Sequence, residues 1–156
     1  MADHVLRMSR RSARCATGAL IAVGVLTLAA CSPQQVQVRD LVNISRAQAG
    51  LKPLNMDPPL AGKAQAWADH LATTGTLAHS ALAEGVPDTW IRIGENVGRG
   101  PSIPAIHDGY MASPAHRTNI LDTGFTNIGT GYAQGPCAPG STQVCQYTVQ
   151  VFAQYR

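Results

Sequence analysis

The stretch Gly94-Glu95-Asn96-Val97-Gly98-Arg99-Gly100, followed downstream by Ser113-Pro114-Ala115-His116-Arg117-Thr118-Asn119-Ile120-Leu121, concentrates ionisable and amide side chains. The chain as a whole is only 13% charged, so this concentration is unusual within it. Glu95 follows the short apolar run Trp90-Ile91-Arg92-Ile93, which is typical of a strand. The pattern therefore predicts a strand over residues 90–97 with a carboxylate near its end.

The second part of this stretch has the features of a helix start. Ser113 is a favourable N-cap and Pro114 suits the first helical position, which places His116 in the first turn. A carboxylate at a strand end and an imidazole at a helix start can face one cleft. We expect His79, in Leu77-Ala78-His79-Ser80, to join them there.

The remaining patterns predict an α+β domain, with helices early, strands late and one helix between them. Asp57 and Pro58 are typical of the cap and first position of a helix, and Gly75 is typical of its end. The expected elements are helices over 36–49, 58–74 and from Ser102 to Tyr110, strands over 90–97, 127–133 and 146–154, a turn over 98–101 and a loop over 81–89.

Several motifs resemble those of the CAP superfamily, named for cysteine-rich secretory proteins, venom antigens and plant pathogenesis-related proteins. They are Gly94-Glu95-Asn96, Ser113-Pro114-x-His116-Arg117-x-Asn119-Ile120-Leu121 and Ile128-Gly129-x-Gly131. Upstream, Arg46-Ala47-Gln48-Ala49-Gly50-Leu51-x-Pro53-Leu54 and His79-Ser80 resemble the bacterial branch. The resemblance runs from about Leu41 to Phe152 and implies a three-layer α–β–α sandwich. The CAP domain is also called the SCP domain.

The resemblance also implies a site. In CAP domains two histidines and two acids typically line a central cleft, and the histidines can bind a divalent metal. By motif, His79 and His116 are similar to the two histidines, and Glu95 is similar to the acid of the Gly-Glu-Asn motif. His79 and His116 are therefore the candidate metal ligands.

The second acid of that cleft has no counterpart in this sequence. In animal relatives it lies three residues after the aromatic of the middle helix, which is Tyr110 here, and the position is Ser113. His107 and Asp108 lie before Tyr110, and neither is assigned the role of the second acid.

Two chemical interpretations of the cleft stay open. Two neutral imidazoles and a carboxylate suit zinc, and a metal-bound water could support hydrolysis. Alternatively His79, Glu95 and His116 hydrogen-bond one another and hold loops together. The sequence shows no Gly-x-Ser-x-Gly nucleophile elbow. We expect Asn96 and Asn119 to satisfy buried backbone groups in either case.

The N-terminus is typical of an export signal. Four arginines among residues 1–15 precede an apolar segment over 16–30, which is short for a spanning helix. Leu28-Ala29-Ala30-Cys31 resembles a bacterial lipobox, in which Cys31 is lipidated and becomes the new N-terminus; the alternative is an ordinary signal peptide. The expected division is a signal peptide over 1–30, a tether over 31–35 and a CAP domain over 36–156.

The net charge after residue 30 argues against nucleic acid as a partner. Four of the twelve basic residues and one of the nine acidic residues precede residue 31, which leaves eight of each in the remainder. A near-neutral domain without zinc-finger spacing or an RNA-binding aromatic set is not expected to bind nucleic acid.

Two cysteines remain after Cys31, and both lie near the C-terminus. Cys137 and Cys145 are separated by a segment rich in Pro, Gly and Ser, and in an exported domain such a pair favours a disulfide. A metal site there would need two further ligands, which nothing nearby supplies.

These observations support three functions. The first is a non-enzymatic cell-envelope module that binds a lipid, a small hydrophobic ligand or a protein partner, with a divalent metal such as zinc in its cleft. The second is a metal-dependent hydrolase acting on envelope peptide or lipid, and the third is a structural lipoprotein. We expect a monomer, anchored to the extracytoplasmic side of a bacterial membrane through Cys31, and we favour the first function.

Overall fold

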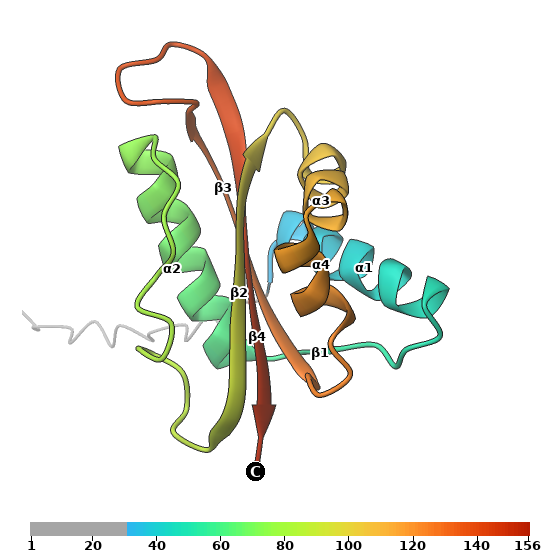
Figure 1. The fold of residues 1–156 in the computed structure, drawn as a ribbon. Helices are drawn as coiled ribbons and strands as arrows, with labels where there is room; N and C mark the ends of the chain where they lie inside the picture. Colours follow the sequence, from blue (N-terminus) through green and yellow to red (C-terminus); the bar gives the residue numbers. More distant parts are fainter. Residues whose placement is uncertain (1–30) are drawn as a thin grey trace, which may run out of the picture.

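The computed structural model describes residues 31–156, in which helices cover both faces of a mixed four-stranded sheet (Figure 1). In chain order the elements are α1 (Pro33–Gln48), β1 (Asn55–Met56), α2 (Pro58–Thr74), β2 (Trp90–Gly100), α3 (Ile103–Ala112), α4 (Pro114–Leu121), β3 (Asn127–Pro136) and β4 (Val144–Tyr155). Helix α2 covers one face, and α1, α3 and α4 cover the other. This confirms the predicted α+β three-layer sandwich.

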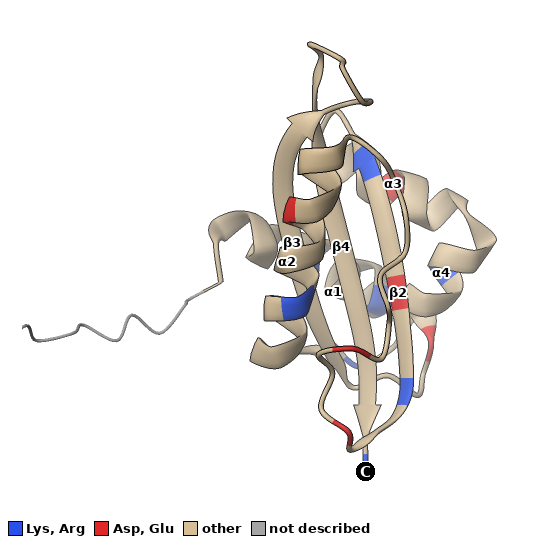
Figure 2. Ribbon diagram, turned by 90° about the vertical axis from the view of Figure 1, so that its left-hand side faces the viewer, with Lys and Arg blue, Asp and Glu red and all other residues tan. Residues whose placement is uncertain are grey.

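The predicted signal peptide, residues 1–30, lies outside the described residues. None of the helices within residues 31–156 combines the length and the apolar character that crossing a bilayer requires. The side chains with formal charge are dispersed over the described chain, as the view in Figure 2 illustrates.

The sheet is built around β4, in the order β1-β3-β4-β2. Strand β4 pairs antiparallel with β2 and β3, and β1 pairs parallel with β3. Tyr147, Val149 and Val151 belong to the core beneath α2, whereas Phe152 belongs to the core on the opposite face. Because both faces of β4 are buried, its sequence shows no clean apolar and polar alternation.

Strand β3 lets α2 approach the sheet unusually closely. A Cβ atom added at Gly129, Gly131 or Gly135 would lie 2.0–2.1 Å from backbone atoms of α2. These three positions share one face of β3, because their spacing is even. The backbone of α2 therefore rests directly on glycines, and no side chain fits between the helix and the strand there.

Helix α1 begins earlier than predicted, at Pro33 rather than residue 36. The Ser32 side chain accepts from the Gln35 backbone N–H, and the Gln35 side chain accepts from the Ser32 N–H, which forms a capping box. The Gln35 side chain also donates to the Thr130 carbonyl at 2.8 Å. The tether predicted over 31–35 is therefore wrong beyond Ser32, because this part of the chain forms the first turn of α1.

Strand β2 continues through the turn that was predicted over 98–101. Gly98, Arg99 and Gly100 pair with β4, so that part of the prediction is wrong. The glycines are required by close packing, since a Cβ at Gly98 would lie 2.7 Å from the Ile106 side chain. Strands β3 and β4 also extend beyond their predicted ends, and β1 was not predicted.

The hairpin between β3 and β4 is closed by the predicted disulfide. Cys137 and Cys145 are bonded, with their Cα atoms 5.0 Å apart, which confirms the pairing. Closing a loop with a sequence separation of 8 residues stabilises the fold by about 2–3 kcal/mol in the chain-entropy account.

Candidate functional site

Glu95 is a buried carboxylate on β2, one of the two edge strands of the sheet. Its side chain is only 2% exposed. Oε1 accepts from His79 Nδ1 at 2.8 Å and from the Ser80 backbone N–H at 3.0 Å, and Oε2 accepts from Ser80 Oγ at 2.6 Å. Three hydrogen bonds, two of them from one residue, satisfy the carboxylate and attach residues 79–80 to β2.

His79 lies in the loop between α2 and β2, and its side chain is 66% exposed. The carboxylate of Glu95 is only an acceptor when ionised, so the His79 Nδ1 must carry the proton in their hydrogen bond. In the neutral ring this leaves a lone pair on Nε2, the nitrogen that can bind a metal or accept a proton. Glu95 thus fixes both the tautomer and the direction of the His79 ring.

His116 lies in the first turn of α4, half-buried, and its ring packs edge-on against Tyr110 with centroids 5.1 Å apart. Burial lowers the pKa of His116 below 6.5, and the charge of a protonated His79 lowers this pKa further. His79 and Glu95 are hydrogen-bonded to each other at β2, and the bond that Asn96 donates to the His116 carbonyl places the start of α4 against the same strand. That the three side chains share one cleft stays a prediction.

An amide network beneath these residues fixes α4 against β2. Asn96 Nδ2 donates to the His116 carbonyl and to Gln150 Oε1, both at 3.0 Å. Asn119 Nδ2 donates to Asn96 Oδ1 at 2.9 Å and to the Glu95 carbonyl at 3.2 Å. Asn96 and Asn119 therefore have the structural role predicted for them, and their bonds hold the backbone of both Glu95 and His116.

The side chains fit a bound metal in part. His79 and His116 offer imidazole nitrogens of the type that zinc accepts. Glu95 differs, because its oxygens already accept three hydrogen bonds. Among residues 31–156, no group of three or more His, Cys, Asp or Glu side chains is placed so that it could hold a metal ion. The two histidines remain the predicted ligands, and Glu95 is better suited to orienting His79.

A comparison of the sequence with known families decides the affiliation of the chain. Residues 39–152 match the cysteine-rich secretory protein family, described as CAP. The chain belongs to the CAP family. This confirms the family resemblance of the Gly-Glu-Asn and Ser-Pro-x-His motifs, and the disulfide and the fold agree with it.

The chain is similar in sequence to one curated protein and similar in fold to several solved structures. The chain is 31% identical over 112 residues to the uncharacterized protein YkwD of Bacillus subtilis, covering 66% of this chain and 44% of that protein. An outer surface protein of Borrelia burgdorferi superposes with a TM-score of 0.63 at 16% identity, over 81% of this chain and 97% of that one. An extracellular protein containing a SCP domain from Bacillus anthracis superposes with a TM-score of 0.60 at 23% identity, over 78% of this chain and 40% of that one.

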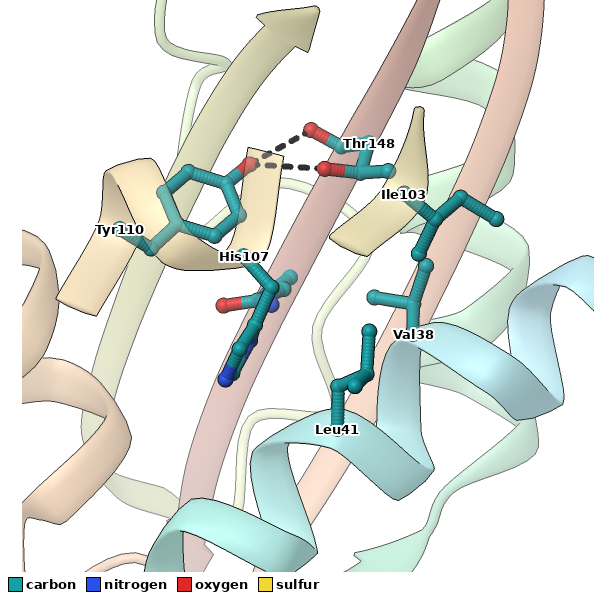
Figure 3. A pocket seen from close by; sticks show the side chains of 7 residues that line it. Val38, Leu41, Ile103, His107, Tyr110 and Thr148 are labelled. Atoms are coloured by element: carbon teal, nitrogen blue, oxygen red, sulfur yellow. Dashed lines mark hydrogen bonds between the residues drawn. The ribbon is translucent and has the colours of Figure 1, made fainter. Parts of the chain in front are cut away.

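The position of the second CAP acid stays without a carboxylate. Ser113 occupies the N-cap position of α4, but its side chain makes no capping hydrogen bond, contrary to expectation. Asp108 is exposed on α3. His107 is buried between α1 and α3 (Figure 3), and its Nε2 lies 2.8 Å from Ser45 Oγ on α1. Neither residue replaces the missing acid.

His107 lines a narrow gap between α1 and α3 that has no room for a water molecule (Figure 3). Its Nδ1 has no hydrogen-bond partner within the described chain. Burial lowers the pKa of His107 below 6.5, and the nearby Asp108 carboxylate opposes this shift only in part. A protonated His107 is thus disfavoured in the folded protein.

We expect the protein to lose stability as the pH falls below about 6.5, because the unfolded chain then binds protons that folded His107 and His116 resist. Above about pH 6.5 both imidazole rings are neutral in the folded and the unfolded chain, so no stability is lost through them there. Urea unfolding at several pH values should give a weaker pH dependence for His107→Leu than for the wild type. His70→Asn, which changes an exposed residue of α2, is the control. An unchanged slope in His107→Leu would contradict this account.

Ser80 and His70 lie next to the candidate site and on the surface of α2, respectively. Ser80 supplies two of the three hydrogen bonds to Glu95, and only its position next to His79 indicated a role. His70 lies on the surface of α2, where its ring stacks on that of Trp67.

Proposed function

We propose that this protein is an extracytoplasmic cell-envelope lipoprotein whose CAP domain is a non-enzymatic binding module. The cleft of His79, Glu95 and His116 is its binding site, where a lipid, a small hydrophobic ligand or a protein partner is held beside a divalent metal such as zinc. The observation that carries this proposal is the hydrogen bonding of Glu95, which presents the Nε2 of an exposed imidazole to the cleft.

The same observation weighs against the metal-dependent hydrolase. If His79 and His116 hold the metal, a hydrolase needs a further carboxylate or imidazole that is free to accept a proton from water. Glu95 is the only acid of the cleft that the family motifs supply, and its oxygens are buried and already accept three hydrogen bonds. A buried carboxylate that already accepts three hydrogen bonds is well suited to orienting its neighbours and poorly suited to abstracting a proton.

The cellular location is supported by relatives rather than by geometry. One is described as an outer surface protein and another as an extracellular protein. The chain spans less than half of the length of the curated relative that it matches, so the activities and partners of that whole protein are not transferred here.

Zinc binding tests the cleft. Calorimetric titration should show one zinc ion bound by the wild type, and binding should weaken as pH falls through the imidazole range, because protonated histidine cannot ligate. His116→Ala should abolish the binding, whereas His70→Ala, at an exposed histidine outside the cleft, should leave it intact. The absence of heat with the wild type, or equal binding by His116→Ala, would remove the metal from the proposal.

Membrane anchoring tests the location. Cys31→Ala should move the protein from the membrane fraction to the soluble fraction or block its processing. The double variant Cys137→Ala/Cys145→Ala removes the disulfide and should stay with the membrane. Unchanged partitioning and mass of Cys31→Ala would show that Cys31 is not the anchor.

A further inference from the structure

A second concave site lies on the other side of the loop that carries His79. It is a groove of about 510 Å³ between α2 and residues 80–85, a volume typical of small-molecule sites. Its lining consists of Lys63, Ala66, Trp67, Ser80, Ala81, Glu84 and Gly85. The groove is lined mostly by apolar atoms and is partly open to solvent. It shares only Ser80 with the residues of the cleft.

Most strong hydrogen-bond donors of this groove are used by the loop itself. Lys63 Nζ donates to the carbonyls of Ala81 at 2.9 Å and Glu84 at 2.7 Å. Trp67 Nε1 donates to the Ala78 carbonyl at 2.9 Å. The floor that remains is the indole ring, two alanine methyl groups and the methylenes of Lys63. One N–H of the Lys63 ammonium and the exposed side chain of Glu84, which also line the groove, remain for a ligand.

The indole of Trp67 is held in one orientation before any ligand arrives. Its Nε1 is fixed by Ala78, and His70 stacks on it with ring centroids 4.6 Å apart at 18°. His70 covers one face of the ring, so Trp67 lines the groove with the surface that remains. A fixed aromatic surface loses little conformational entropy when a ligand binds, which favours binding.

The charges and shape of the groove select the ligand. Lys63 and Glu84 carry opposite charges, so the lining favours neither cations nor anions. An acyl chain needs enclosure on nearly all sides, whereas this groove is open to solvent. A pyranose ring has a C–H face that packs on the negative face of an aromatic ring and hydroxyl groups that stay in water or bond to the rim.

We propose that this groove binds a neutral pyranose ring of a glycan chain, stacked on Trp67, with hydroxyl groups bonded to Glu84 and Lys63. This site is separate from the cleft and does not depend on the metal. The chain has two tryptophans, Trp67 and Trp90, so its two indole N–H signals provide an internal comparison.

The test is a titration of protein expressed from the whole 156-residue chain with chitotetraose, a neutral oligosaccharide, followed by ¹H–¹⁵N NMR. The Trp67 indole signal should shift in a saturable way while that of Trp90 stays unchanged. Ala66→Gln places a larger side chain in the groove and should weaken binding about tenfold or more. Thr73→Gln, at an exposed position of α2 outside the groove, is the matched control and should bind as the wild type does.

Three results would overturn the proposal. One is no shift of the Trp67 signal at millimolar saccharide, and another is equal binding by Ala66→Gln once circular dichroism has shown that it is folded. The third is a shift of Trp67 by dodecanoate but not by chitotetraose, which would make the groove an acyl site. His116→Ala should keep saccharide binding, so failure of the cleft and failure of the groove are distinguishable.

Discussion

Gly131→Ala is expected to lower the free energy of unfolding by about 3 kcal/mol or more. The added Cβ would lie 2.1 Å from the Ala64 carbonyl oxygen and 2.4 Å from its carbonyl carbon. Backbone atoms in a helix cannot move aside as a flexible side chain can. Helix α2 would have to lift from β3, which would open the core that contains Leu60 and Leu71.

The matched control is Gly62→Ala, the same change on α2 itself. A Cβ at Gly62 has no heavy atom within 4 Å, and alanine is the better helix former, so this variant should gain about 1 kcal/mol. Urea unfolding of both variants measures these changes in the free energy of unfolding. Stability of Gly131→Ala within about 0.5 kcal/mol of the wild type would show that α2 does not rest on β3 as described.

Glu95→Gln is expected to cost about 2–3 kcal/mol and to release residues 79–80 from β2. The amide is nearly isosteric with the carboxylate, but only one of its two positions accepts hydrogen bonds. It cannot accept from His79 Nδ1, the Ser80 N–H and Ser80 Oγ as the carboxylate does. Hydrogen exchange of the Ser80 amide should become faster, because the weakened attachment lets residues 79–80 open away from β2 more often.

Glu84→Gln is the control for this variant, because it makes the same change in the same loop. Glu84 is exposed, and it is the backbone carbonyl, which this change leaves in place, that accepts from Lys63. Its effect should stay within about 0.5 kcal/mol. Equal and small effects of the two variants would mean that Glu95 does not hold the loop.

Local signals predicted those parts of the fold that depend on a few neighbouring residues. Helix α2 begins at Pro58 after an Asp57 cap whose side chain accepts from the Leu60 N–H, and Gly75 ends it with a left-handed backbone. Strand β1 was not predicted, because two residues carry no period and it pairs with β3, about seventy residues away. The glycines of β2 were predicted to form a turn, because the local sequence does not show that α3 packs closely against them.

The candidate site shows the same division. The family motifs indicated His79, Glu95 and His116, because each stands in a short recognisable string. The bonds that organise them could not be predicted, since they depend on how the loop crosses β2. The two bonds that Ser80 donates to Glu95 are the clearest case, and the burial of His107 against Ser45 is another.

The central claim is that Glu95 holds His79 with its Nδ1 protonated, which leaves Nε2 available to a ligand. The most direct test is a long-range ¹H–¹⁵N correlation spectrum of the histidine side chains at neutral pH, with His79 assigned from a His79→Asn variant. The account predicts the Nδ1–H tautomer for His79 in the wild type, and a mixture of tautomers in Glu95→Gln. A wild-type spectrum in which His79 is the Nε2–H tautomer, or a mixture that Glu95→Gln leaves unchanged, would contradict it.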